Sequence, residues 1–126
     1  MICPYCSAKA EWCENSKIYG RNFGSSYMCY WCKNCGASVG CHRNSRTPLG
    51  TMANQELKRL RMRCHAFIDA SWKDANYARR SVYLCLEKIF GFPVHISESN
   101  EEICRLITSL PFQKKFIDMI KSFKKR

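Results

Sequence analysis

Two pairs of cysteines near the start of the chain have the residue type and the spacing to hold a metal ion. Two residues separate the members of each pair, in Cys3-Pro-Tyr-Cys6 and in Cys32-Lys-Asn-Cys35. A tight turn of this length places both thiolates on the same side, and Gly36 suits the positive φ that such a turn often needs after its second cysteine. Two such turns, brought together by a hairpin, predict a tetrahedral site of four thiolates for one zinc ion.

Cys29 lies at the same spacing from Cys32 and therefore competes with Cys35 for it. The rival turn has the sequence Cys-Tyr-Trp-Cys followed by lysine, and its bulky residues make it the poorer turn. We interpret Cys29 as a packed thiol within a strand. An alternative stays open, in which Cys41 or His42 replaces one thiolate or helps to hold a second metal ion. The remaining thiols are interpreted as buried apolar positions, since free cysteine is among the most buried residue types: Cys13, Cys64, Cys85 and Cys104.

The predicted zinc is structural rather than catalytic, because four thiolates leave no open coordination position for water or substrate. A module of 46 residues with few Leu, Ile and Val also buries too little apolar surface to fold alone. Iron would fit four sulfurs as well, with zinc as the default. The sequence has no H-E-x-x-H motif, phosphate-binding loop or nucleophile elbow, so we expect no enzyme. His65 and Asp69, four residues apart, are interpreted as an intrahelical pair.

The first 46 residues differ in composition from the rest and predict a zinc-ribbon module. They hold seven of the ten cysteines and four of the six glycines. Aromatic and β-branched runs predict short strands in a hairpin or a three-stranded sheet, at residues 17–19, 27–31 and 37–39. The Thr-Pro-Leu-Gly turn at 47–50 marks the predicted boundary to a helical region, residues 47–126, packed on the ribbon. The predicted fold class is α+β, a zinc-ribbon-like β module followed by a small bundle of three to four helices.

The helical region has four predicted helices. Apolar residues at three-and-four spacing predict the first from about residue 51 and the second over residues 74–90. Ser99 and Glu102 have the spacing of a capping box at the start of the third helix. Pro111 is expected to break that helix, and a last amphipathic helix then begins at Phe112 and carries a basic face.

Longer strings of the sequence resemble a known family. They read CPYC, then IYGRNFG, then CKNCGASVGCH, then PLGTMANQELKRLRMRCHAFIDASW, and with later elements they extend to about residue 104. In their order and spacing the chain resembles a family of small zinc-finger-containing proteins of unknown function that is common in phages and prophages. The second turn of that family corresponds to Cys32 and Cys35 here. The resemblance implies a phage-type origin and a structural zinc, and it implies no activity.

The formal net charge of +11 is unevenly distributed and predicts an acidic partner. Residues 1–50 and 51–80 each carry +4, residues 81–110 carry −2, and residues 111–126 carry +5. A positive field of this kind favours nucleic acid or a nucleoprotein complex, although a solubilising surface has the same charge. Aromatic rings among the cations of the ribbon strengthen the hypothesis, because cations contact phosphates and rings stack on bases. The predicted contact residues are Arg21, His42, Arg43, Arg46, Lys58, Arg59, Arg61, Arg63, Lys121, Lys124 and Lys125.

Two functional hypotheses follow. In the first, the chain is a non-catalytic, phage-type zinc-binding protein that binds nucleic acid or a host nucleoprotein effector through basic faces. In the second, it is a phage-encoded inhibitor of a host defence system, similar to an anti-CRISPR protein, that blocks nucleic-acid loading on a Cas effector or a similar nuclease. The sequence has no apolar run of about eighteen residues and no secretory leader pattern, so we expect a cytoplasmic protein without a membrane partner.

Overall fold

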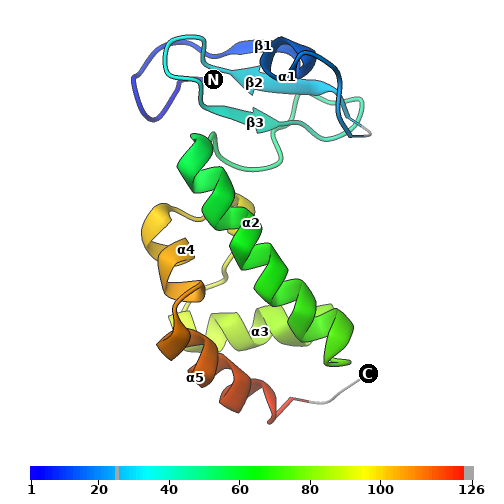
Figure 1. Cartoon of the computed structure of the whole chain (residues 1–126), viewed down its shortest axis with the longest axis vertical. Helices are drawn as coiled ribbons and strands as arrows, with labels where there is room; N and C mark the ends of the chain where they lie inside the picture. Colours follow the sequence, from blue (N-terminus) through cyan, green and yellow to red (C-terminus); the bar gives the residue numbers. More distant parts are fainter. Residues whose placement is uncertain (25, 124–126) are drawn as a thin grey trace. The chain divides into compact units, whose positions relative to one another are not determined.

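The fold is α+β, as predicted: a three-stranded antiparallel sheet, with one short helical turn between its first two strands, is followed by the longer helices (Figure 1). The computed structural model describes residues 1–24 and 26–123, apart from the side chain of Asp74. The chain forms two compact units, Met1–Lys58 and Arg59–Arg126. Within the described residues, no helix is both long enough and apolar enough to cross a bilayer.

The sheet of the first unit has the strand order β1-β2-β3. Its strands are β1 (Glu11–Glu14), β2 (Met28–Trp31) and β3 (Ser38–Gly40). In the register, Cys13 faces Cys29, and Trp12 faces Tyr30. Beyond the strands, single bridges pair Ser38 with Ala53 and Cys41 with Pro48. The segment after β3 therefore folds back onto the sheet, and the compact unit extends to Lys58.

The prediction of a strand at residues 17–19 is wrong. These residues lie in a single helical turn, α1 (Ser16–Tyr19). The turn ends at Gly20, which has a φ of 83° and whose N–H donates to the Ser16 carbonyl. The first strand is Glu11–Glu14 instead, and Asn15 ends it. The Asn15 side chain bonds to both the N–H and the carbonyl of Phe23, each at 3.0 Å, and so closes the connection between β1 and β2 as a loop.

The second unit is helical, and each of its longer helices buries apolar side chains. Helix α2 (Gln55–Asp69) continues into a π-helical turn, η1 (Ala70–Asp74), and is followed by α3 (Arg79–Phe90), a short 3-10 turn, η2 (Ile96–Glu98), α4 (Glu101–Ile107) and α5 (Leu110–Ile120). Helix α5 packs on α3 and α4. Phe116 is fully buried, with its ring centroid 5.2 Å from that of Phe67. Cys64, Cys85 and Cys104 are buried as well, in agreement with their predicted packing role.

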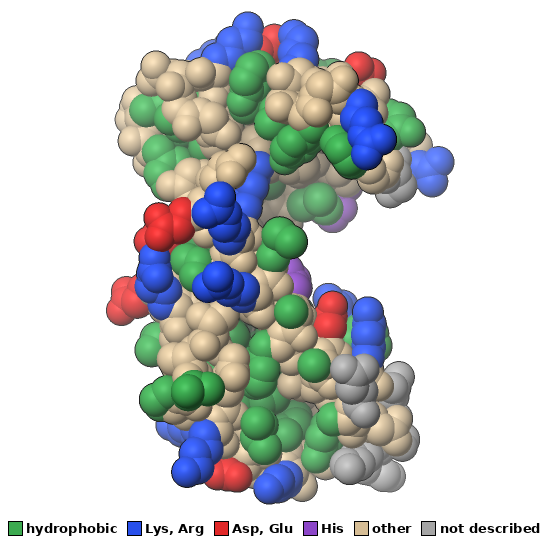
Figure 2. Space-filling model, viewed as in Figure 1, with side chains coloured by type: hydrophobic (Ala, Val, Ile, Leu, Met, Phe, Trp, Pro, Cys, Tyr) green, Lys and Arg blue, Asp and Glu red, His purple; other side chains and the backbone are tan. Residues whose placement is uncertain are grey.

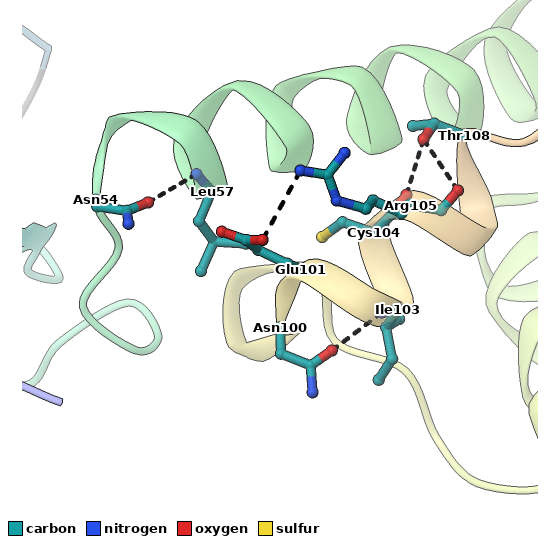
Figure 3. Close-up of polar contacts among 8 residues, drawn as sticks. All are labelled: Asn54, Leu57, Asn100, Glu101, Ile103, Cys104, Arg105 and Thr108. Atoms are coloured by element: carbon teal, nitrogen blue, oxygen red, sulfur yellow. Dashed lines mark hydrogen bonds and ion pairs between the residues drawn. The ribbon is translucent and has the colours of Figure 1, made fainter. Parts of the chain in front are cut away.

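The starts predicted for the second and third helices of the helical region are corrected by the structure. Helix α3 begins at Arg79 rather than at residue 74, because Asn76 takes a left-handed φ of 63° that interrupts the helix. The cap of α4 is Asn100, not Ser99: the Asn100 side chain accepts a hydrogen bond from the Ile103 N–H at 3.0 Å (Figure 3). Ser99 is buried instead and donates to the His95 carbonyl at 2.9 Å.

Pro111 does not break a helix; it lies in the first turn of α5. The N–H that proline lacks has no helical partner at that position, so the proline costs nothing there. Ser109 caps the same helix, and its hydroxyl oxygen accepts from the Phe112 N–H at 3.4 Å. Pro111, predicted to end one helix, instead marks the start of the next.

The cap of α4 gives a stability prediction. Asn100→Ala leaves the Ile103 N–H without its side-chain acceptor, so we expect the free energy of unfolding to fall by about 1 kcal/mol. Asn100→Asp keeps an acceptor oxygen and is expected to stay close to the unsubstituted protein. Urea denaturation followed by circular dichroism measures both. Equal losses for the two variants would show that the cap contributes nothing.

Candidate metal centre and basic surface

The four predicted ligands come together in the first unit. The sulfur atoms of Cys3, Cys6, Cys32 and Cys35 all lie within 4.8 Å of one another. Two of these separations are 3.3 Å, between Cys3 and Cys35, and 3.5 Å, between Cys6 and Cys32. A zinc ion with bonds of about 2.3 Å to four sulfurs holds them roughly 3.8 Å apart. The cluster therefore has the composition and size of a site for one structural zinc ion.

The two cysteine turns have the same backbone pattern. In the first, the Cys3 carbonyl accepts from the Ser7 N–H at 2.9 Å, and the Cys3 N–H donates to the Ala8 carbonyl at 2.8 Å. The same two bonds, each 2.8 Å long, join Cys32 to the residues four and five positions later. The residue after the second cysteine is left-handed in both turns, with a φ of 64° at Ser7 and 84° at Gly36. The turn geometry expected of metal-binding knuckles is thus present twice.

Local hydrogen bonds act on the thiols in opposite directions. The Asn34 side chain, and then the Ala8 N–H, lower the pKa of Cys6 to about 6. At Cys35 the Ala37 N–H acts in the same direction, but the neighbouring thiols and burial outweigh it and raise the pKa to about 12. Thiolates this close repel one another, so a cation is needed before all of them can ionise. Zinc supplies that charge, and its binding weakens as the pH falls because protons compete for the sulfurs.

Cys29 does not belong to this group of four cysteines, as predicted. It lies in β2 between Cys13 on β1 and Gly40 on β3, with only 3% of its surface exposed. Burial, followed by the neighbouring Cys13, raises the pKa of Cys29 to about 12, which keeps it a neutral thiol. Cys41 and His42 are not members of the cluster, which is the single group of this kind in the described part of the chain.

Two of the predicted contact residues, Arg43 and Arg46, line one hollow of about 590 Å³ on the sheet. Trp12 on β1 and Tyr27, just before β2, line it with them. The Arg46 guanidinium lies over the Trp12 ring, 4.2 Å from the centroid. Glu14 is the one acidic residue among those that line the hollow. We refer to this site, defined by Trp12, Tyr27, Arg43 and Arg46, as the basic hollow.

Hydrogen bonds fix the loop that carries the two arginines. The His42 N–H donates to the Thr47 carbonyl at 2.9 Å, and the Thr47 N–H donates to the Ser45 hydroxyl at 2.9 Å. The Tyr30 hydroxyl donates to the Arg46 carbonyl, also at 2.9 Å. The loop is therefore attached to β2 at the very residue that stacks on Trp12.

The structure does not group Arg21 or His42 with the two arginines of the hollow. Arg21 lies over the Phe23 ring at 4.6 Å, near the turn of α1, and Tyr19 meets the same ring edge-on. His42 is exposed but does not line the hollow. Lys58 is held inside the first unit, because its ammonium group donates to the hydroxyls of Ser38 and Tyr19.

The predicted cations of the second unit differ in their surroundings. Arg61 donates to the Ser99 carbonyl through Nε at 3.1 Å and through a terminal nitrogen at 2.9 Å, so it ties α2 to the start of α4. Arg59 and Arg63 are exposed on α2, and Lys121 lies 3.8 Å from Asp118. Figure 2 shows lysines and arginines spread over the visible face rather than gathered in one patch. Lys124 and Lys125 lie outside the described residues.

The ligand assignment gives a metal-content prediction. Cys32→Ala or Cys35→Ala removes a zinc ligand, so we expect loss of zinc and unfolding of the first unit. Cys29→Ala removes only a packed thiol; we expect one zinc per chain and a loss of about 1 kcal/mol in stability. Elemental analysis and circular dichroism on matched preparations measure both effects. Equal zinc loss from Cys29→Ala would contradict the assignment.

The repeated turn gives a prediction about backbone strain. A Cβ at Gly36 would meet no atom within 4 Å, so Gly36→Ala has only its left-handed φ to disfavour it. We expect a loss of about 1–2 kcal/mol in the zinc-loaded protein, measured by denaturant unfolding. Gly40→Ala is the matched control, because Gly40 lacks a left-handed φ and its Cβ would make an ordinary contact of 3.4 Å with Leu49. A larger loss for the control would contradict the strain argument.

The comparisons with known proteins agree with this site. Residues 1–112 match the DUF3268 family, described as a zinc-finger-containing domain. The match includes all four cysteines of the cluster and ends shortly after the start of α5. Searches among curated proteins and among solved structures give no significant match. Because the match covers most of the chain, the chain belongs to the DUF3268 family of zinc-finger-containing domains.

Proposed function

We propose that the chain is a non-catalytic zinc-binding protein that binds nucleic acid, free or within a nucleic-acid-handling complex. The observation that carries the proposal is the basic hollow, where two arginines and two aromatic residues meet on the zinc-ordered sheet. Arginine is suited to phosphate because its planar group donates several hydrogen bonds. Aromatic rings next to it offer flat surfaces for bases.

The charges around the hollow support this role. Lys17 and Lys33, elsewhere on the first unit, both lie 3.1 Å from Glu11 and neutralise it. Arg43, in contrast, has no acidic partner among the residues that the structure describes. Glu14 lines the hollow, yet it forms no ion pair with either arginine in that described part. The guanidinium donors of the hollow are therefore available to a ligand, and the net charge of +11 attracts a polyanion from a distance.

The zinc serves this function by ordering the surface rather than by reacting. Four thiolates complete its coordination, so neither water nor substrate gains access to the metal. A phage-type inhibitory role is compatible with the proposal, since a cationic inhibitor that holds the guide or target strand itself would block nucleic-acid loading.

Salt dependence tests the proposal. We expect the zinc-loaded chain to bind a fluorescein-labelled oligonucleotide in an anisotropy titration, with log K falling linearly as log salt rises. The double variant Arg43→Ala/Arg46→Ala removes both cations of the hollow, so affinity should fall, and the slope on a single strand should decrease in magnitude by about 0.7 for each of the two that contacts a phosphate.

A double variant with the same change in net charge, Lys9→Ala/Lys114→Ala, is the matched control, since both lysines are exposed and lie outside the hollow. It should keep most of the slope and the affinity. Absence of binding at low salt to single strands and duplexes of either DNA or RNA would overturn the proposal. Equal effects of the two double variants would show that the hollow has no special part in binding.

A further inference from the structure

We propose that the basic hollow takes one unpaired base of a single strand, stacked on the guanidinium plane of Arg46, while Arg43 contacts a neighbouring phosphate. The inference rests on the proposed function and adds to it the form of the nucleic acid and the role of each arginine. It is carried by the pair of Trp12 and Arg46, in which the guanidinium carbon lies over the indole ring, 4.2 Å from its centroid, as in a cation–π contact.

Trp12 contacts the guanidinium of Arg46 on the side away from the base, and it does not itself stack on the base. Its side chain is half-buried in β1, and Arg46 covers one face of its ring. Its indole N–H is buried and without a hydrogen-bond partner of suitable geometry among the described residues, and it lies next to the Cys41 thiol. The flat surface that Trp12 would otherwise present is therefore replaced by that of the guanidinium. Unpaired bases stack on arginine planes as they do on aromatic rings.

Arg46 is pre-positioned for this role, because the Tyr30 hydroxyl holds its carbonyl and the bonds of residues 42–47 close its loop. A side chain whose backbone and ring partner are already fixed loses little freedom on binding. Tyr27 lines the same hollow with 48% of its surface exposed and offers a second wall. The volume of about 590 Å³ lies within the range of roughly 300–1,000 Å³ of small-molecule pockets, enough for one nucleotide.

A single strand fits this arrangement better than a duplex. In a duplex the faces of the bases are occupied by their neighbours, and only base edges and phosphates face outward. A base that stacks on the guanidinium of Arg46 needs a free face, which unpaired nucleotides provide. Glu14, which also lines the hollow, repels phosphates that come near its carboxylate. The backbone of the strand is therefore expected to follow the side of Arg43, where the positive charge has no acidic partner within the described residues.

Arginine-to-lysine substitutions separate stacking from charge. Arg46→Lys keeps the positive charge but loses the plane, so we expect affinity for a single strand to fall by about tenfold, close to the loss for Arg46→Ala. Arg43→Lys keeps a cation for phosphate and is expected to cost about twofold at most. Arg63→Lys, at an exposed position on α2, is the matched control and should be neutral. The titrations use the zinc-loaded full chain with single strands of DNA and of RNA.

A ligand lacking bases completes the test. An abasic oligonucleotide of equal length keeps the phosphates, so we expect it to bind about tenfold more weakly and to be insensitive to Arg46→Lys. The Arg46→Lys effect on a normal strand of either DNA or RNA supports the inference. Unchanged affinity of Arg46→Lys for both strands, or tighter binding of a duplex than of either strand, would overturn it while leaving the proposed function intact. Absence of all binding by the unsubstituted chain would overturn both.

Discussion

Repulsion among four thiolates is the constraint on which the first unit depends. The four sulfurs converge within 4.8 Å, and they come from two turns separated by 25 residues of sequence, so only a cation can hold them together as thiolates. The apolar cluster around them is small, and its buried members are Cys3, Ala10, Cys32, Ala37, Val39 and Met52. Side chains of this size contribute little burial energy, whereas structural zinc contributes on the order of 10–16 kcal/mol in small fingers.

The basic hollow follows from the metal centre through the register of the sheet. Cys32 comes directly after β2, so the zinc fixes the end of this strand. The β1–β2 register then places Trp12 opposite Tyr30. Tyr30 holds the Arg46 carbonyl, and Arg46 stacks on Trp12. Each step is a direct contact, and the metal needs no chemistry of its own to shape the surface.

The sequence predicted those features that short-range turn chemistry decides. The spacing of two residues and Gly36 identified the second knuckle, and the poor turn residues around Cys29 excluded the rival pair. The α+β class followed from the change from a cysteine- and glycine-rich segment to helical periodicity. The sequence did not indicate the backbone conformation of Ser7, which is left-handed like that of Gly36 in the other cysteine turn.

Other features depended on contacts that a linear pattern does not contain. Residues 17–19 have strand-forming types, but the bonds from Asn15 to Phe23 make the region a loop with one helical turn. Asn100 caps α4 because Ser99 is drawn into the core and bonds to His95. The grouping of Arg46 with Trp12 arises from strand pairing across eighteen positions, Trp12 with Tyr30. No local signal in the sequence indicates it.

X-ray absorption at the zinc edge of the purified full chain tests the central claim most directly. We expect a first shell of four sulfurs at about 2.3 Å, with no lighter ligand. A shell of three sulfurs and one nitrogen or oxygen would contradict it, because it would bring a residue such as His42, or a water molecule, to the metal and replace a closed structural site by an open one.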